Sequence, residues 1–187
     1  VIGQTQLLPA GWLPAGGVDG GGALQLDGTR WLQAPDDAAL AVRSTVTMEA
    51  WVQVERFQTT WTPLFYQGDG GFSQRAYSLW LRNDGVVHLS TASSTGAVQT
   101  LATDPGLVKP GEWAHVAAVI DRVSGQMRIV VDGVERASGV VATGLSAASQ
   151  LPLVIGLPIE NASDQGRLLG RIDGVRLWNV ARSSADI

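Results

Sequence analysis

The stretch Thr45-Val46-Thr47-Met48-Glu49-Ala50-Trp51-Val52-Gln53-Val54-Glu55 decides the fold. Apolar and polar residues alternate along it, and a period of two is typical of a β-strand that buries one face. The alternation places on one face Val46, Met48, Ala50, Val52 and Val54. The segment therefore predicts a half-buried strand with an apolar inner side.

Turn residues on either side of this strand predict further antiparallel pairs. Asn83-Asp84-Gly85 separates the alternating runs 77–82 and 86–90. These residue types tolerate the positive φ that tight hairpin turns need. A second hairpin joins 113–121 to 126–131 through Arg122-Val123-Ser124-Gly125, and Asp132-Gly133 turns the chain into 134–137.

Shorter strands are expected at 23–26, 30–34, 153–155 and 169–178, and a short helical end at 183–187. Many strands with closely spaced turns predict an all-β fold, a two-sheet antiparallel jelly-roll β-sandwich. We expect one domain over 1–187, in which 1–22 is either a leader or an edge strand, with 4–8 as the candidate strand.

Composition limits the function. The 187 residues include no cysteine, so disulfides, thiolate catalysis and cysteine-based zinc sites are excluded. The net charge is −4 and the basic residues are scattered, a pattern that predicts binding neither to nucleic acid nor to an anionic membrane. No apolar run reaches the length of a membrane span, so no membrane insertion is expected.

Several segments, in order along the chain, resemble the laminin G-like and pentraxin-like jelly rolls of the concanavalin A-like superfamily. They are Ala23-Leu24-Gln25-Leu26-Asp27-Gly28, Thr47-Met48-Glu49-Ala50-Trp51-Val52, Gly111-Glu112-Trp113-Ala114-His115-Val116-Ala117, Val130-Val131-Asp132-Gly133, Gly170-Arg171-Ile172-Asp173-Gly174-Val175-Arg176-Leu177-Trp178-Asn179 and 181–187. The resemblance covers 23–187, with one departure, since Gly174 stands where the family usually has Glu.

The resemblance implies two antiparallel sheets with a concave front that often faces a ligand. It also implies a module within a larger secreted or surface protein, whose partners include the other domains of that protein. Because the chain begins at Val1, we expect it to be a segment of a longer chain. We expect an extracellular or cell-surface location and a bacterial source.

Some relatives with this fold are glycoside hydrolases, whose chemistry requires paired carboxyl groups. The E-x-D-x-E strand pattern of laminarinase-type enzymes and the aspartate boxes of sialidases do not occur in the sequence. His88 and His115 belong to no nucleophile or metal motif, and packed structural histidines are the favoured interpretation of both. We expect no enzyme activity.

Two acidic clusters are candidate metal sites. Pentraxins bind calcium with a similarly placed pair of loops, and here these loops carry Asp69, Glu160, Asn161, Asp164 and Gln165. The alternative is that these are ordinary solvated turns. A second, structural calcium could bind between Asp27 and Asp173, although hydrogen bonding within turns is the favoured interpretation of this pair.

Seven tryptophans require an explanation. Trp51, Trp80, Trp113 and Trp178 lie within strand motifs, and we expect most of them in the core. Trp61, Tyr66 and Phe72 form the candidate sugar platform, because aromatic rings stack on the apolar faces of sugars. A plug at one end of the sandwich is the favoured alternative for Trp61.

The sequence therefore predicts a non-catalytic recognition module for carbohydrate or a cell-surface glycoprotein, with calcium as a candidate cofactor. A structural or protein-interaction spacer without a small ligand is the alternative. A glycoside hydrolase is the least supported hypothesis.

Overall fold

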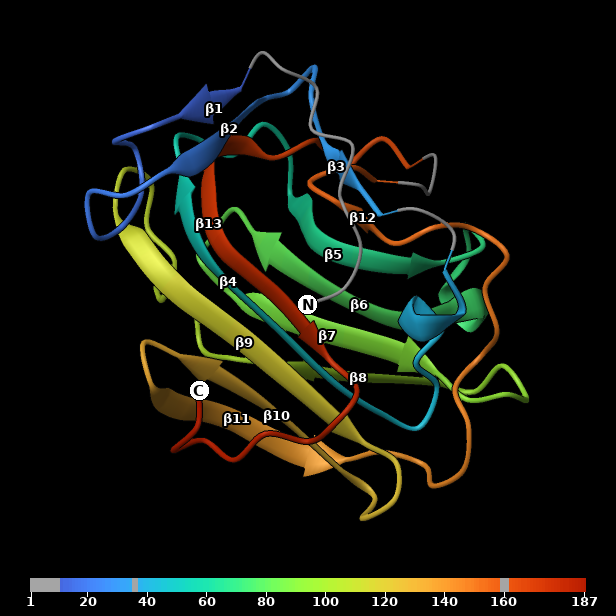
Figure 1. Ribbon diagram of the computed structural model, residues 1–187. Helices are drawn as coiled ribbons and strands as arrows, with labels where there is room; N and C mark the ends of the chain where they lie inside the picture. Colours follow the sequence, from blue (N-terminus) through green and yellow to red (C-terminus); the bar gives the residue numbers. More distant parts are fainter. Residues whose placement is uncertain (1–10, 35–36, 159–161) are drawn as a thin grey trace.

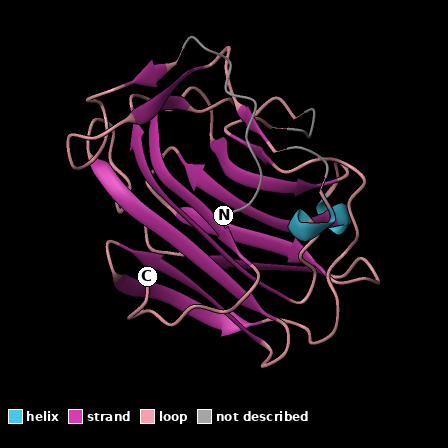
Figure 2. Cartoon of the chain, viewed as in Figure 1, coloured by secondary structure: helices cyan, strands magenta, loops and turns pink. Residues whose placement is uncertain are grey.

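The computed structural model describes residues 11–34, 37–158 and 162–187. Two antiparallel sheets pack face to face as a jelly-roll β-sandwich, so the predicted fold class is confirmed (Figure 1). One sheet has seven strands in the order β1-β2-β13-β4-β9-β10-β11, and the other has six in the order β3-β12-β5-β6-β7-β8. Strands dominate the described chain, and two short 3-10 helices lie near one end of the sandwich (Figure 2).

The strands of the seven-stranded sheet are β1 (Trp12–Leu13), β2 (Ala23–Asp27), β4 (Thr45–Val54), β9 (Trp113–Asp121), β10 (Gln126–Val131), β11 (Val134–Val140) and β13 (Leu169–Trp178). Those of the six-stranded sheet are β3 (Leu32–Gln33), β5 (Trp61–Gly68), β6 (Arg75–Arg82), β7 (Val87–Ala92), β8 (Val98–Ala102) and β12 (Val154–Ile155). The 3-10 helices are η1 (Ala38–Leu40) and η2 (Phe72–Gln74).

The core lies between the sheets and follows the alternation of the strands. The five apolar side chains predicted for the inner face of β4 are all buried there, each no more than 3% exposed. Both predicted hairpins form, and Gly85, Asp132 and Gly133 have the positive φ that their turns require. The expected helical end at 183–187 is wrong, since the structure has a turn there. The candidate strand at 4–8 lies outside the described residues, whereas 12–13 pairs with β2 at the edge of the sheet.

The expectation that most of the four strand tryptophans lie in the core is wrong, since among them Trp80 alone is buried, in a second and smaller cluster with Tyr66 and Val154. None belongs to the main core cluster. On β4 the alternation that turns Ala50 and Val52 inward turns Trp51 outward, and on β6 it turns Trp80 outward between Leu79 and Leu81.

A buried carboxylate fastens the C-terminal tail, residues 179–187, to the outer face of the seven-stranded sheet. Glu49 on β4 accepts hydrogen bonds from Trp178 Nε1 at 2.9 Å and Arg182 Nη1 at 3.0 Å, and Arg176 Nη1 lies 3.7 Å away. Thr47, two residues earlier on the same face, donates to the Val180 carbonyl at 2.7 Å. Arg182 of the tail thus adds a charged partner to a carboxylate that β13 already contacts through Trp178 and Arg176.

Candidate ligand-binding hollow

Strand β6 supplies the floor of a hollow on the outer face of the six-stranded sheet. Its residues alternate between the two sides: Tyr77, Leu79 and Leu81 belong to the main core, while Trp80 packs on the opposite side with Tyr66 and Val154. Trp80 is held there by a hydrogen bond from its indole Nε1 to Ser78 Oγ at 3.0 Å. The apolar outer patch is therefore built by the same period of two that builds the core.

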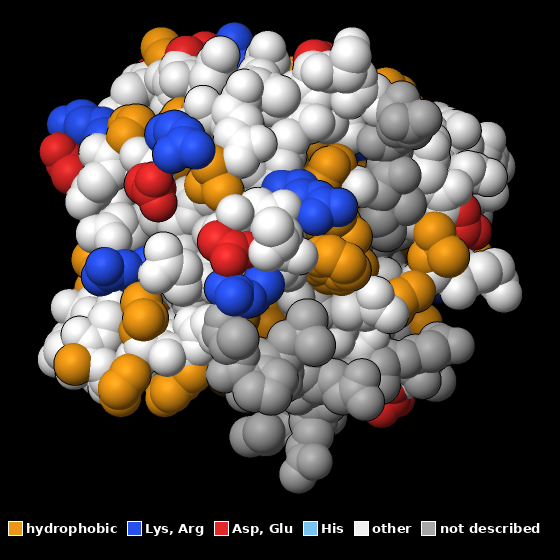
Figure 3. Space-filling view, turned by 90° about the horizontal axis from the view of Figure 1, so that it is seen from above, with side chains coloured by type: hydrophobic (Ala, Val, Ile, Leu, Met, Phe, Trp, Pro, Cys, Tyr) orange, Lys and Arg blue, Asp and Glu red, His pale blue; other side chains and the backbone are white. Residues whose placement is uncertain are grey.

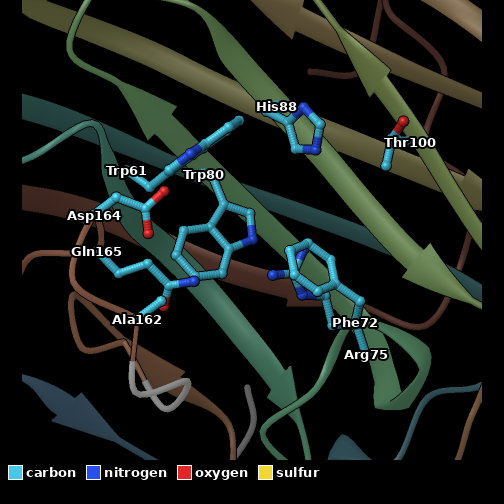
Figure 4. Close-up of a pocket in the computed structure, with 9 residues that line it drawn as sticks. All are labelled: Trp61, Phe72, Arg75, Trp80, His88, Thr100, Ala162, Asp164 and Gln165. Atoms are coloured by element: carbon cyan, nitrogen blue, oxygen red, sulfur yellow. The ribbon is translucent and has the colours of Figure 1, made fainter.

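The aromatic rings of the hollow contact one another edge to face. The ring centroids of Trp61 and Trp80 lie 6.4 Å apart at 85°, and those of Trp61 and His88 lie 5.0 Å apart at 72°. Tyr66 contacts Trp80 from another side at 5.7 Å and 88°. Figure 4 shows the Trp61 ring standing on edge beside the broad face of Trp80. Such edge-to-face pairs are favourable arrangements of aromatic quadrupoles and fix the ring orientations.

The hollow has a volume of about 330 Å³ and draws its lining from β5, η2, β6, β7, β8 and the loop before β13 (Figure 4). Its lining residues are Trp61, Phe72, Arg75, Trp80, His88, Thr100, Ala162, Asp164 and Gln165. Aromatic faces and a few polar groups in a concave site are the usual lining of a small-molecule site.

The loop 162–166 forms one wall and is fastened to the start of β5. The Trp61 amide donates to the Asp164 carbonyl at 2.9 Å, and the Gly166 amide donates to the Trp61 carbonyl at 2.8 Å. Gln165 and Trp61 also form an isolated parallel bridge. Asp164 and Gln165 therefore stand beside Trp61 although a hundred residues separate them in the chain.

The opposite wall is built on Arg75. This arginine is buried, donates from Nη1 to Ser90 Oγ at 3.1 Å, and places its guanidinium carbon 4.1 Å from the Phe72 ring centroid and 5.0 Å from that of Trp80. Cation–π contact of this kind fixes an aromatic ring over the guanidinium. Phe72 is 63% exposed, so it offers ring surface to solvent at the rim.

The hollow keeps its histidine neutral. Burial lowers the pKa of His88 to about 4, with further contributions from the positive charges of Arg75 and Arg82. At neutral pH the imidazole thus offers one nitrogen as a donor and the other as an acceptor. Among the described lining residues Asp164 is the single carboxylate.

The predicted sugar platform is partly assembled here. Trp61 and Phe72 both line the hollow, whereas Tyr66 is 0% exposed and supports Trp80 from below. Trp61 packs with the outer cluster of Tyr66, Trp80 and Val154, and the alternative that it plugs the end of the sandwich stays a hypothesis.

Asp69 lies apart from Asp164 and Gln165, the other described members of the predicted calcium-binding loops. Asp69 follows the end of β5 and accepts hydrogen bonds from Ser149 Oγ at 2.8 Å and the Gln150 amide at 2.7 Å. The Asp164 carbonyl accepts a hydrogen bond from Trp61, at the other end of β5. Because β5 has eight residues, its length separates Asp69 from Asp164 by about 25 Å. Gln165 lies next to Asp164 in the hollow, and Glu160 and Asn161 lie outside the described residues.

The second predicted metal pair is also apart. β2 and β13 do pair, but Asp27 lies opposite Leu169, four residues from Asp173, or about 13 Å along the strand. Asp27 accepts from the Thr29 amide and hydroxyl and pairs with Arg30, and Asp173 accepts from the Gly174 amide. Within the described ranges no three acidic or histidine side chains form a cluster that could hold a metal ion.

Five lining residues were not predicted from the sequence as site residues: Arg75, Trp80, His88, Thr100 and Ala162. The alternation along β6 contained the signal for Trp80, because Tyr77, Leu79 and Leu81 already fill the inner face. No comparable signal marks Thr100, which lies on a short edge strand.

Charges elsewhere are mixed. Figure 3 shows acidic and basic side chains interspersed on the face that it displays. In the part of the chain that the structure describes, no helix is long and apolar enough to cross a membrane.

Comparison with known proteins supplies a family and a set of similar folds. A family model of laminin G-like domains, described as the concanavalin A-like lectin/glucanases superfamily, matches residues 26–187. No curated protein matches the sequence.

Three solved structures illustrate the similarity of fold. The binding domain of Paraclostridial Mosquitocidal Protein 1 superposes with a TM-score of 0.70 at 13% identity, over 94% of this chain and 44% of that one. The CBM40 of the Ruminococcus gnavus IT-sialidase, bound to α2,3-sialyllactose, gives 0.71 at 16% identity, over 87% and 92%. Domain 4 of AbnA, an extracellular GH43 arabinanase from Geobacillus stearothermophilus, in complex with arabinotriose, gives 0.65 at 23% identity, over 94% and 78%. The chain thus spans less than half of the first of these proteins.

Proposed function

Because the chain belongs to the laminin G-like family of the concanavalin A-like lectin/glucanases superfamily, we propose that it is a non-catalytic module that binds carbohydrate in the hollow on the outer face of its six-stranded sheet. The observation that carries the proposal is the pairing of accessible rings with fixed polar groups. Trp61 and Phe72 offer apolar surface, and Asp164, His88 and Thr100 surround it with hydrogen-bonding groups. A sugar presents both kinds of surface, an apolar ring face and a rim of hydroxyls.

Two of the similar folds support this proposal through their own ligands. The Ruminococcus gnavus module is bound to α2,3-sialyllactose and the Geobacillus domain to arabinotriose. Both are oligosaccharides, although they differ in charge and ring size. They support sugar as the ligand class and leave the identity of the sugar to the side chains of this hollow.

The carboxylates of the hollow support the non-catalytic part of the proposal. Glycoside hydrolysis by the usual mechanisms requires two carboxyl groups across the scissile bond. Among the described lining residues Asp164 has no carboxylate partner, and the neutral His88 is adjacent to two arginines rather than to an acid. The described lining thus offers groups suited to binding a sugar, and it includes no carboxylate pair of the kind that cleaves one.

The setting of the module is part of the proposal. We place it in a larger secreted or cell-surface protein, next to other domains that use its binding to reach a glycan or glycoprotein. Calcium assistance stays a prediction: it rests on loop composition near Asp164 and Gln165, together with Glu160 and Asn161.

Glycan binding tests the function directly. We expect the wild-type protein to bind at least one member of a glycan array that includes α2,3-sialyllactose and arabinotriose. Isothermal titration with the best-bound glycan should show about two- to tenfold weaker binding by Trp61→Ala and by Phe72→Ala, since stacking on one ring contributes about 0.5–1.5 kcal/mol.

Trp12→Ala is the matched control, because Trp12 is 58% exposed on β1 of the other sheet. It should bind like the wild type, and circular dichroism should show that all three variants fold. If the wild type binds no glycan, the proposal fails and the spacer hypothesis gains. Release of reducing ends from any bound glycan would contradict the non-catalytic assignment.

Calcium is tested on the same protein. If calcium assists binding, a chelator should weaken glycan affinity and lower the Tm, and Asp164→Ala should remove the response. An unchanged Tm and affinity would contradict the calcium prediction and leave the sugar proposal intact.

A further inference from the structure

Exposure changes steadily across the outer face of the six-stranded sheet. Trp80, His88 and Ala102 lie directly opposite one another on β6, β7 and β8. Trp80 is 1% exposed, His88 is half-buried and Ala102 is exposed. The neighbouring row of paired residues shows the same change in exposure: Ser78 and Ser90 are fully buried, and Thr100 on β8 is exposed.

The hollow is closed toward β5 and β12. Trp61 and the loop 162–166 are joined by two backbone hydrogen bonds and stand across that side. Beyond them, the outward side chains Tyr66 and Val154 are 0% and 2% exposed, so protein covers this half of the sheet. A sugar chain that occupies the hollow has no exposed sheet surface on which to continue in this direction.

The hollow is open toward β8. This strand is the edge of the sheet, and its outward side chains, Val98, Thr100 and Ala102, are all exposed. We call these three residues the β8 shelf. Thr100 also lines the hollow, so the two surfaces are continuous. Two strand spacings, about 10 Å, separate Trp80 from Ala102, a distance comparable to the length of a disaccharide.

We infer that the module recognises the end of a glycan chain: the terminal sugar units enter the hollow, and the rest of the chain leaves across the β8 shelf. The inference rests on the proposed sugar-binding function. The volume of about 330 Å³ lies at the lower end of the ~300–1,000 Å³ typical of ligand pockets, which suits a terminal mono- or disaccharide. The loop 162–166 and Phe72 wall the hollow on two opposite sides, and buried sheet closes it toward β5 and β12, so β8 is the open side. The interior of a linear polymer does not fit such a site, because an interior segment must leave in two directions.

Partial cleavage of a polysaccharide separates the two binding modes. The probes are linear arabinan, xylan, glucomannan and β-glucan, each before and after brief digestion with an endo-acting hydrolase, at equal mass. Digestion multiplies chain ends without changing the mass of sugar. We expect the amount of protein bound per mass of the recognised polymer to rise in proportion to the number of ends.

The shelf is tested with an oligosaccharide series of the recognised sugar, from disaccharide to hexasaccharide. We expect the wild type to bind the hexasaccharide about tenfold more tightly than the disaccharide, the value of about one to two additional hydrogen bonds. Ala102→Glu, which fills the shelf, should remove this gain and leave the disaccharide affinity within about twofold. Ser138→Glu on β11 of the other sheet is the matched control, because Ser138 is exposed and remote from the hollow, and it should keep the gain.

The outcomes distinguish the two proposals. If no probe binds the wild type, the sugar-binding function itself fails. If a polymer binds, but the bound amount follows mass rather than ends, recognition of chain ends is overturned while sugar binding stands. A gain with length that Ala102→Glu leaves unchanged would overturn the exit across β8.

Discussion

Replacing Glu49 by alanine is expected to lower the free energy of unfolding by about 3 kcal/mol, because it removes the carboxylate that joins the tail to the seven-stranded sheet. The Glu49 side chain is 2% exposed and accepts from both Trp178 Nε1 and Arg182 Nη1. Hydrogen bonds to a charged group contribute about 1.5–3 kcal/mol each, and breaking a buried pair costs about 3–5 kcal/mol. We take the lower end, because the Arg182 and Arg176 side chains are 23% and 55% exposed and water can solvate them after the change.

Urea unfolding followed by tryptophan fluorescence measures the effect, together with the Tm. For a domain of this size about 3 kcal/mol corresponds to a fall in Tm of about 6–12 °C. Glu49→Gln should lose less, since its amide oxygen can still accept from Trp178. Glu55→Ala is the matched control on the same stretch of chain. Glu55 pairs with Arg56 at 3.0 Å, but both side chains are more than half exposed, so the change should stay within about 0.5 kcal/mol.

A double-mutant cycle with Arg182→Ala separates the ion pair from general loss of packing. We expect a coupling of about 1 kcal/mol, as for residues in one hydrogen-bonded network. A loss below about 1 kcal/mol for Glu49→Ala, or additive effects in the cycle, would refute the view that this carboxylate fastens the tail.

Two further predictions concern the hollow and the sheet behind it. Because the pKa of His88 falls from about 6.5 in the unfolded chain to about 4 in the fold, its contribution to stability is complete above pH 6.5 and is lost as the pH falls toward 4. The loss between pH 7 and pH 5 should reach at most about 2 kcal/mol, and His88→Gln should reduce the slope of unfolding free energy against pH; an unchanged slope would contradict this. Gly170→Ala should abolish soluble, folded protein, because Gly170 has a φ of 150° and an added Cβ would overlap the backbone carbonyl oxygen of Gln53 on β4. Gly106→Ala, at φ 84° with open space around it, should cost only about 1 kcal/mol and fold, as judged by circular dichroism.

Local patterns predicted most of the fold because strands and turns are encoded over a few residues. The alternation in β4 and the Asn-Asp-Gly turn before β7 depend on near neighbours alone, and both appear as expected. Strand β8 was missed because its outward residues are exposed, so Val98–Ala102 has no apolar face strong enough to stand out.

The tryptophans show where such reasoning fails. Their size suggested a place in the core, but the position of a residue in the alternation decides which face it takes. Trp51 and Trp80 both occupy outward positions between inward aliphatic residues. Hydrophobicity predicts burial, and a fully buried Trp80 on the outer face satisfies that rule without entering the main cluster between the sheets.

The hollow itself could be predicted only in part, because its residues meet through tertiary pairing. Trp61 and Phe72 were identified by type, but Asp164 joins them through backbone bonds that no local pattern reveals. For the same reason the sequence could not show that Asp69 and Asp164 lie at opposite ends of β5.

The floor and the walls of the hollow differ in their tolerance to mutation. Its floor residue Trp80 and the neighbouring Ser78 and Ser90 are buried within paired strands, so altering them disturbs the sheet. Its walls at 72–74 and 162–165 are largely exposed surface segments, which accept substitution and insertion readily. Substitutions in the rim segments can therefore change the ligand specificity while the buried strand residues keep the sheet intact. This gives a physical route by which one sandwich fold comes to bind many different ligands.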